Sequence, residues 1–216
     1  MTYTPQQRAG IQALREAGGR LKLPPAHIAY VLATAWHETG QEMVPNRENL
    51  NYSVEGLLGK FSRVRISEAD ARRLGRKPNE PALGIERQRA IGNVLYGGIW
   101  GRANLGNTEP DDGWHFRGGG YDHCTGRRNF RAVADASGLG DVLMVNPDLI
   151  LRAPLAATAI VTGMIVGRYT GVRLRDRLPT TGLATWDQFK SARPIINGTD
   201  RAADIANYAM DFQNGK

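Results

Sequence analysis

The sequence predicts a mostly helical α+β protein, and three observations support this fold class. Apolar residues recur at helical spacing in several segments, and most of these segments have a Ser, Thr or Pro at the start or a Gly at the end. Residues 97–126 differ, because they are rich in glycine and aromatic residues and poor in helix formers. The chain of 216 residues is long enough for one domain or for two small lobes that share a cleft.

Each expected helix has its own start or stop signal. Thr4 and Pro5 open a helix over 5–17, and Pro25 opens a second one that Gly40 closes. The further expected helices run over 53–61, 67–75, 79–96, 127–137, 147–151, 154–169, 185–191 and 200–213. A long loop and then a short strand or hairpin are expected near Trp114–Thr125. Since no repeat and no Pro/Ser linker divides the chain, we expect one domain over residues 1–216.

Charge and cysteine content narrow the class of protein. The formal net charge of +7 favours a polyanionic partner, but basic residues form no block and no nucleic-acid-binding motif is present, so nucleic acid is not expected. Cys124 is the one cysteine of the sequence, which excludes an intramolecular disulfide. The start of the chain lacks a secretory signal, and the apolar stretch 154–167 is too short to span a bilayer. We therefore expect a chain made in the cytoplasm, without stable membrane insertion.

The stretch AWHETGQEMVPNRENLNYS, residues 35–53, places Glu38, Glu42 and Glu48 where a helix ends. Acidic residues are unfavourable at this end of the helix dipole. A Glu38 carboxyl held against Trp36 would lose hydration, which favours the protonated form that a general acid needs. From spacing alone, a capping or ion-paired glutamate remains the simpler interpretation.

Glu48 offers a second carboxylate ten residues after Glu38. An inverting glycosidase needs its two carboxyl groups about 6.5–9.5 Å apart, and a retaining one needs about 5–5.5 Å. Glu42 is a rival, although its i, i+4 spacing places it on the same side as Glu38. The HETGQE sequence lacks the second histidine of a zinc motif, so we expect no metal site.

The segment 117–126 supports no other chemistry by itself. RGGGY lacks the Lys and Ser/Thr that end a phosphate-binding loop. On a strand, His123 would point away from Asp122 and Cys124, so these neighbours would not form a triad. The aromatic residues of this region fit a core and a sugar-stacking wall equally well: Trp100, Trp114, Phe116 and Tyr121.

Taken together, these motifs resemble a known family. ATAWHETG, RENLNYSVEGL, YGGIWGRANLGNTEPDDGWHFRGGGY, TGRRNF and NPDL occur in this order over about 25–150, with a weaker echo in RPIING at 193–198. The combination is similar to phage and bacterial endolysins of the family 19 chitinase-like glycoside hydrolases. The resemblance implies a lysozyme-like fold, with two mostly helical lobes flanking a central groove, and inverting cleavage of β-1,4 bonds between N-acetylated sugars.

The resemblance also implies roles for single residues. Glu38 matches the general acid, Glu48 the base that activates water, and Thr125 the residue that helps to hold this water. No cofactor is implied. Substrate contacts are expected from His123, Asn129, Tyr121, Asn197 and Arg117.

The chain departs from the family pattern at 119–124. Gly119 replaces an arginine, and Asp122 and Cys124 replace two apolar strand residues. A buried Asp122 would need a partner, for which Arg117 or Arg127 is the expected choice.

The expected function is that of an endolysin that cleaves the peptidoglycan glycan strand after the membrane has been permeabilised. A cationic protein favours anionic peptidoglycan over neutral chitin. We expect a monomeric chain that is catalytic over its whole length and has no separate wall-binding domain. A chitinase on the same scaffold and a glycan-binding protein without activity are the alternatives.

Overall fold

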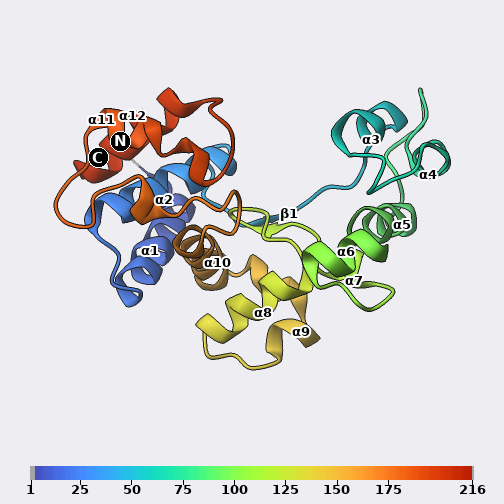
Figure 1. Ribbon diagram of the computed structural model, residues 1–216, viewed down its shortest axis with the longest axis horizontal. Coiled ribbons are helices and arrows are strands. Elements are labelled where there is room, and N and C mark those ends of the chain that lie inside the picture. Colours follow the sequence, from blue (N-terminus) through green and yellow to red (C-terminus); the bar gives the residue numbers. More distant parts are fainter. Residues whose placement is uncertain (1–2, 216) are drawn as a thin grey trace. The chain divides into compact units, whose positions relative to one another are not determined.

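The computed structural model describes residues 3–215, and this part of the chain is mostly helical (Figure 1). Its α-helices are α1 (Pro5–Arg20), α2 (Pro25–Glu38), α3 (Val54–Lys60), α4 (Glu68–Leu74), α5 (Ile85–Tyr96), α6 (Gly98–Leu105), α7 (Asp112–His115), α8 (Arg127–Ala136), α9 (Val142–Val145), α10 (Ala153–Val166), α11 (Trp186–Ser191) and α12 (Ala202–Gln213). Three 3-10 turns are η1 (Pro147–Leu151), η2 (Leu174–Asp176) and η3 (Arg193–Ile195). The two-residue strands β1 (Asn46–Arg47) and β2 (Gly119–Gly120) form one small sheet. The predicted mostly helical α+β class is confirmed.

The chain divides into two compact units, each with its own apolar core. Unit 1 comprises Met1–Asn46, Gly120–Asp122 and Ile150–Lys216. Unit 2 comprises Arg47–Gly119 and His123–Leu149. Unit 2 therefore lies within the sequence of unit 1, and the short segment Gly120–Asp122 of unit 1 divides it into two parts.

Helix α2 is the centre of unit 1. All its residues from Ala29 to Trp36 are buried, so this helix needs neighbours on every side. Helices α1, α10 and α12 provide them. The Tyr30 ring stacks on Phe189 with 6.4 Å between centroids, and its hydroxyl donates to the carbonyl of Ala192 at 2.9 Å. The core of unit 1 is thus formed by helices, and their packing around α2 fixes the position of its C-terminal end.

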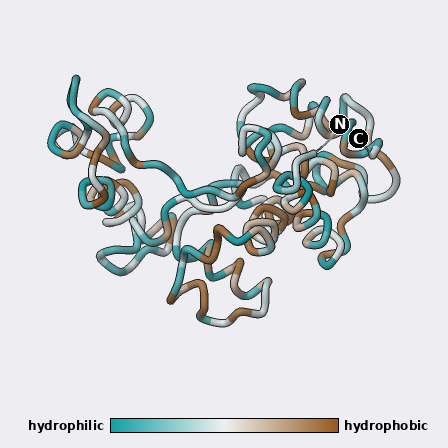
Figure 2. Tube along the Cα trace, turned by 180° about the vertical axis from the view of Figure 1, so that it is seen from behind, coloured by the Kyte–Doolittle hydropathy of each residue, from teal (hydrophilic) through white to brown (hydrophobic). Residues whose placement is uncertain are grey.

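Helix α10 accounts for the most apolar stretch of the sequence. Figure 2 shows apolar residues along this helix, and its residues from Ala156 to Val161 are all buried in unit 1. In the part of the chain that the structure describes, we find no helix with the length and apolar character that crossing a bilayer requires.

Unit 2 has a smaller core made by short helices. Leu50, Leu57 and Ile91 are fully buried there. Polar contacts supplement this core, since the Arg87 guanidinium donates to the carbonyls of Leu74 and Gly75 at 3.0 and 3.1 Å. Such contacts satisfy the last carbonyls of α4, which have no partner within the helix.

A buried ion pair adds to the core of unit 2. The Asp112 side chain is 1% exposed and pairs with Arg127 at 2.5 Å. It also accepts hydrogen bonds from the backbone N–H groups of Thr108 and Glu109 at 2.8 and 3.1 Å. Asp112 therefore ties the loop before α7 to the start of α8.

Most helices begin where the sequence predicts, but the region around 79–105 differs. Helix α5 begins at Ile85 and not at Asn79: Asn79 has a left-handed backbone with φ +64°, and the extended Gly84 with φ −62° and ψ 160° is the residue from which the helix starts. Helix α6 lies in the segment predicted to be a loop. A Cβ on Gly101 would meet the Tyr96 carbonyl oxygen at 1.9 Å. Gly101 thus allows α6 to pack closely against Tyr96, and a glycine at this position does not indicate a loop.

The predicted β element is smaller than expected. An antiparallel bridge joins Gly119 to Cys124, and helix α7 occupies the first part of the expected hairpin. Residues 121–123 form a turn in which His123 has a left-handed backbone with φ +52°. His123 would point away from its neighbours only on a strand, and this condition is not met because residues 121–123 form a turn.

Candidate functional site

Glu38 is the last residue of α2, and its carboxylate faces a buried arginine of the same unit. The Arg193 guanidinium, 2% exposed, donates to Glu38 Oε1 at 3.5 Å. Its Nε atom donates to the carbonyl of Asp200 at 3.0 Å. The half-buried Glu38 thus has a cation as its neighbour.

The end of α2 holds Glu38 in place. Thr39 follows it, and the Thr39 hydroxyl donates to the carbonyl of Ala35 at 2.8 Å and accepts from the Met43 N–H at 3.0 Å. Glu42, the rival carboxylate, is exposed, and its side chain forms no hydrogen bond or ion pair within the described residues. The structure therefore fixes Glu38 and leaves Glu42 in solvent.

Glu48 lies in unit 2, where neutral donors surround its carboxylate. The Tyr96 hydroxyl lies 2.7 Å from Oε1 and 2.8 Å from Oε2. The Gly118 N–H donates to Oε2 at 3.3 Å, and the Tyr52 hydroxyl lies 3.5 Å from Oε1. These contacts orient both oxygens of the carboxylate.

Both tyrosines remain protonated donors at ordinary pH. Burial and then the adjacent Glu48 carboxylate raise the pKa of Tyr96. The pKa of Tyr52 is raised by the same causes in the same order. Each hydroxyl therefore keeps the proton with which it holds Glu48.

Gly118 brings the predicted residue His123 beside Glu48. A Cβ on Gly118 would lie 3.1 Å from His123 Nδ1 and 3.2 Å from Glu48 Cβ, so a larger residue would push the two apart. The exposed His123 has the left-handed backbone noted above, which is uncommon outside glycine. Such strain occurs often at functional sites.

Thr125 and Asn129 extend this group within unit 2. The Thr125 hydroxyl donates to the carbonyl of His123 at 2.7 Å, and the Asn129 amide donates to the carbonyl of Thr125 at 2.7 Å. The hydroxyl oxygen of Thr125 keeps its capacity to accept a hydrogen bond. The structure thus gathers four predicted residues in one unit: Glu48, His123, Thr125 and Asn129.

Arg117 is held against an aromatic ring of unit 2. Its guanidinium carbon lies 3.4 Å from the centre of the Trp114 ring, and the group donates to the Trp114 carbonyl at 2.7 Å. Burial and then the neighbouring Arg47 lower the pKa of Arg117 to about 10. Arg117 remains a cation at neutral pH and is fixed by packing.

Unit 1 contains the other two predicted contacts. Tyr121 has no exposed surface and packs in the core of unit 1, so this structure does not support a sugar contact through it. Burial raises the pKa of Tyr121 to about 12. Asn197 is exposed, and its side chain accepts from the Gly198 N–H at 2.9 Å.

The expected partner of Asp122 is wrong. Asp122 accepts a hydrogen bond from the Tyr169 hydroxyl in unit 1, whereas Arg127 pairs with Asp112 and Arg117 stacks on Trp114. Cys124 is buried. Among residues 3–215, no three His, Cys, Asp or Glu side chains gather closely enough to hold a metal ion.

Sequence reasoning missed three residues that hold the glutamates. Tyr52 follows Glu48 by four residues in the RENLNYS motif, and this short spacing was its one signal. Tyr96 lies at the end of α5, 48 residues from Glu48, and nothing in the sequence relates the two. Arg193 had one signal, because it opens the RPIING echo of the family pattern.

Comparison with known proteins gives one partial similarity. Over 104 residues the chain is 33% identical to a "glycosyl hydrolase family 19 domain-containing protein" of Haemophilus influenzae. The match covers 48% of this chain and 45% of the relative, so the chain spans about half the length of the curated relative it matches. No family model matches the chain.

Proposed function

We propose that this chain is a glycoside hydrolase of the family 19 type. The observation that carries the proposal is the contrast among the three glutamates of residues 35–53. Glu38 and Glu48 are held by specific donors, whereas Glu42 between them lies in solvent. The partial similarity to a glycosyl hydrolase family 19 domain protein supports the same class of reaction.

In the proposed reaction, Glu38 protonates the glycosidic oxygen as the leaving group departs. Glu48 takes a proton from the water that attacks the anomeric carbon from the opposite face, with inversion. Thr125 helps to hold this water through the oxygen that remains able to accept a hydrogen bond. Sugar contacts are assigned to His123, Asn129 and Asn197.

We further propose that the substrate is the peptidoglycan glycan strand and that the chain acts as an endolysin. The formal net charge of +7 supports an anionic polymer over neutral chitin. In this proposal the protein is a monomeric catalytic unit over residues 1–216 that reaches the wall after membrane permeabilisation.

Mass spectrometry of products from purified peptidoglycan tests the proposal. We expect wild type to release muropeptides with reducing N-acetylmuramic acid ends and Glu38→Gln to release none. Glu42→Gln is the matched control, because Glu42 is exposed and lies four residues after Glu38, so this variant removes the same charge from the solvent-facing side chain. Reducing N-acetylglucosamine ends would mean a glucosaminidase, and 1,6-anhydro ends a lytic transglycosylase. Soluble sugars from chitin without wall cleavage would mean a chitinase. No cleavage of either polymer would contradict the proposal.

A further inference from the structure

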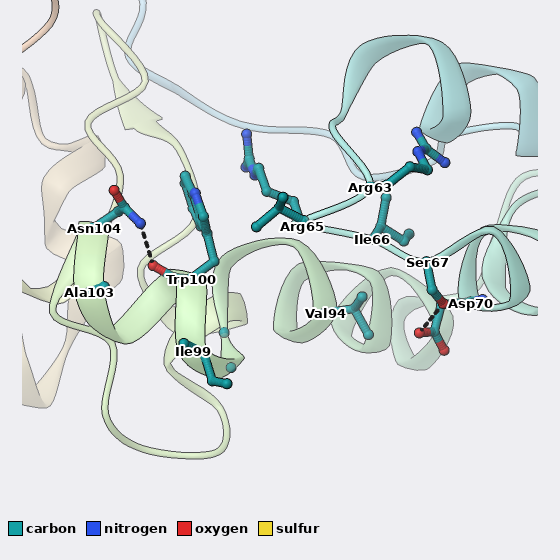
Figure 3. Close-up of a pocket in the computed structure, with 13 residues that line it drawn as sticks. Arg63, Arg65, Ile66, Ser67, Asp70, Val94, Ile99, Trp100, Ala103 and Asn104 are labelled. Carbon is teal, nitrogen blue, oxygen red and sulfur yellow. Dashed lines mark hydrogen bonds between the residues drawn. The ribbon is translucent and has the colours of Figure 1, made fainter.

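A hollow with a volume of about 620 Å³ lies within unit 2, between the loop that precedes α4 and the start of α6 (Figure 3). Its size is within the range of small-ligand sites. The lining residues are Arg63, Val64, Arg65, Ile66, Ser67, Asp70, Val94, Gly97, Gly98, Ile99, Trp100, Ala103 and Asn104. None of these residues has a role in the proposed reaction.

Arg65 is the distinctive residue of this hollow, because aromatic rings hold its guanidinium. The guanidinium carbon lies 4.4 Å from the centre of the Trp100 ring, 4.8 Å from that of Phe61 and 4.9 Å from that of Tyr96. Figure 3 shows the Arg65 and Trp100 side chains extending in the same direction. Stacking of this kind fixes the planar group and removes part of its hydration.

The charge of Arg65 has no acidic partner within the described residues. Its Nε atom donates to the carbonyl of Leu95 at 3.2 Å, and it takes part in no ion pair. The acidic residue among those that line the hollow, Asp70, is already bound by Arg73 at 2.5 Å and by the Ser67 hydroxyl at 2.7 Å. The terminal nitrogens of Arg65 are thus available to a ligand.

Arg63 differs from Arg65, although both line the hollow. The Arg63 guanidinium donates to the carbonyls of Leu58 and Phe61, where it caps the end of α3. It therefore has a structural role, and Arg65 is the cation that a ligand would meet.

Apolar side chains complete the rim. Ile99 is 92% exposed and Val64 is 78% exposed, although both are large and apolar. Exposed apolar groups that gather beside a hollow mark a binding surface more often than isolated ones do. A ligand that suits this hollow carries a carboxylate for Arg65 and small apolar groups for the rim.

The hollow adjoins Glu48 through one side chain. The Tyr96 ring contacts the Arg65 guanidinium on one side, and its hydroxyl contacts both oxygens of Glu48. All three residues belong to unit 2. A ligand paired with Arg65 is therefore separated from the proposed base by the Tyr96 side chain.

We propose that this hollow binds the peptide that branches from the peptidoglycan glycan strand, with Arg65 pairing to a peptide carboxylate. This inference rests on the proposed function and specifies its substrate. Where the peptide is attached, the lactyl carboxyl of N-acetylmuramic acid is an amide, so the sugars of the strand are neutral and would leave the guanidinium unpaired. The alanine methyl groups of the peptide would contact the apolar rim, and its carboxylate would accept two parallel hydrogen bonds from Arg65.

Direct binding tests this proposal without relying on cleavage. The probes are N-acetylmuramyl-L-alanyl-D-isoglutamine, which has a free carboxylate, and its neutral methyl ester, titrated while the Trp100 indole signal is followed by NMR. We expect wild type to bind the acid about tenfold more tightly than the ester. Arg65→Gln should abolish this preference, and Arg65→Lys should retain part of it. Equal binding of acid and ester by wild type, or no response at Trp100, would overturn the proposal.

Arg72→Gln is the matched control. Arg72 lies on α4 of the same unit and pairs with Glu68 on the surface, away from the hollow, so its loss removes the same charge. This variant should keep the preference for the acid. An equal loss of preference in Arg72→Gln and Arg65→Gln would show a general charge effect and would overturn the proposal.

Cleavage assays then separate this inference from the proposed function. Peptidoglycan is compared with the same peptidoglycan after its peptide carboxylates have been converted to neutral amides. Arg65→Gln should lower kcat/KM about tenfold more on the untreated strands than on the amidated strands. Cleavage by wild type with an equal Arg65→Gln effect on both substrates would keep the enzyme and overturn the peptide site. Carboxylate-selective binding without cleavage would keep the peptide site and overturn the enzyme.

Discussion

Units 1 and 2 hold their candidate carboxylates by different means. In unit 1, a helix that is buried on all sides ends at Glu38, and a buried cation, Arg193, faces the carboxylate. In unit 2, Glu48 lies just after β1, and neutral hydroxyl and amide donors hold it. Unit 1 thus depends on apolar packing and one charge, whereas unit 2 depends on a network of polar contacts.

The comparison changes how the net charge is interpreted. Several arginines of unit 2 have structural partners: Arg63 and Arg87 donate to helix-terminal carbonyls, and Arg127 pairs with a buried Asp112. These groups stabilise the fold and are only partly available to attract a polyanion. Attraction to a wall polymer is therefore better tested at a particular cation, such as Arg65, than through the total charge.

The largest effect on stability is expected from the apolar core of unit 1. Phe189→Ala would remove a fully buried ring that stacks on Tyr30. We expect the free energy of unfolding to fall by about 3–5 kcal/mol, measured by urea denaturation. The conservative change Phe189→Leu should cost clearly less. A loss below 1 kcal/mol for Phe189→Ala would contradict the description of this core.

The second effect tests the polar network of unit 2. Asp112→Asn would leave Arg127 without its anionic partner, and we expect a loss of about 3 kcal/mol in the free energy of unfolding. Circular dichroism during urea denaturation at pH 7 measures this change. If Asp112→Asn lowers the free energy of unfolding by no more than the loss of an exposed ion pair does, burial does not strengthen this ion pair.

The same residue gives a prediction for pH. Burial pushes the pKa of Asp112 upward, but hydrogen bonds from Arg127 and from the N–H groups of Glu109 and Thr108 outweigh it, so the net pKa is lowered. The stabilisation from Asp112 is complete above the ordinary aspartate pKa and is lost as pH falls through the lower folded value. Unfolding measured from pH 6 to pH 2 should therefore show the Asp112→Asn effect shrink below about pH 4.

The third effect concerns activity. Tyr96→Phe would remove the hydroxyl that contacts both oxygens of Glu48 and leave the ring beside Arg65. Because a hydrogen bond to a charged group contributes about 1.5–3 kcal/mol, we expect kcat on peptidoglycan to fall at least tenfold. Tyr52→Phe should have a smaller effect, since its hydroxyl lies 3.5 Å from Glu48. Unchanged kcat in Tyr96→Phe would show that this contact does not orient the base.

The smallest effect is expected at the surface of unit 2. Asp70→Asn would break an ion pair with Arg73, whose side chain is 63% exposed. We expect the free energy of unfolding to change by less than about 1 kcal/mol, because solvent screens such pairs. Thermal unfolding of Asp70→Asn, compared with that of Asp112→Asn, measures the difference in stability between an exposed ion pair and a buried one.

The helices of unit 1 could be predicted because each carries its signal locally. Thr4 caps α1, Pro25 begins α2 and Thr185 caps α11, and all three signals lie in the residues that they organise. Helix α6 was not predicted because its glycine Gly101 allows close packing against Tyr96, which is a requirement of the tertiary structure. Local composition does not distinguish that use of glycine from a loop.

The site could be predicted in part for a similar reason. Glu38 and Glu48 lie in motifs with a recognisable order along the chain, so the sequence alone indicates both. Tyr96 and Arg193 reach these glutamates from 48 and 155 residues away, and only folding relates them. The error at Asp122 has the same origin, since its partner Tyr169 lies 47 residues further along the chain.

The segmented order of unit 1 has a consequence for synthesis on the ribosome. Helix α2 emerges early, but its buried faces are completed by α10 and α12, which are translated only after the whole of unit 2. Unit 2 can therefore fold on the nascent chain while α2 still exposes residues such as Tyr30 and Leu32. During this interval the nascent chain exposes an apolar surface that chaperones bind, and translation that stalls after unit 2 has emerged but before α10 has done so would leave a folded unit 2 attached to an apolar helix with no partner.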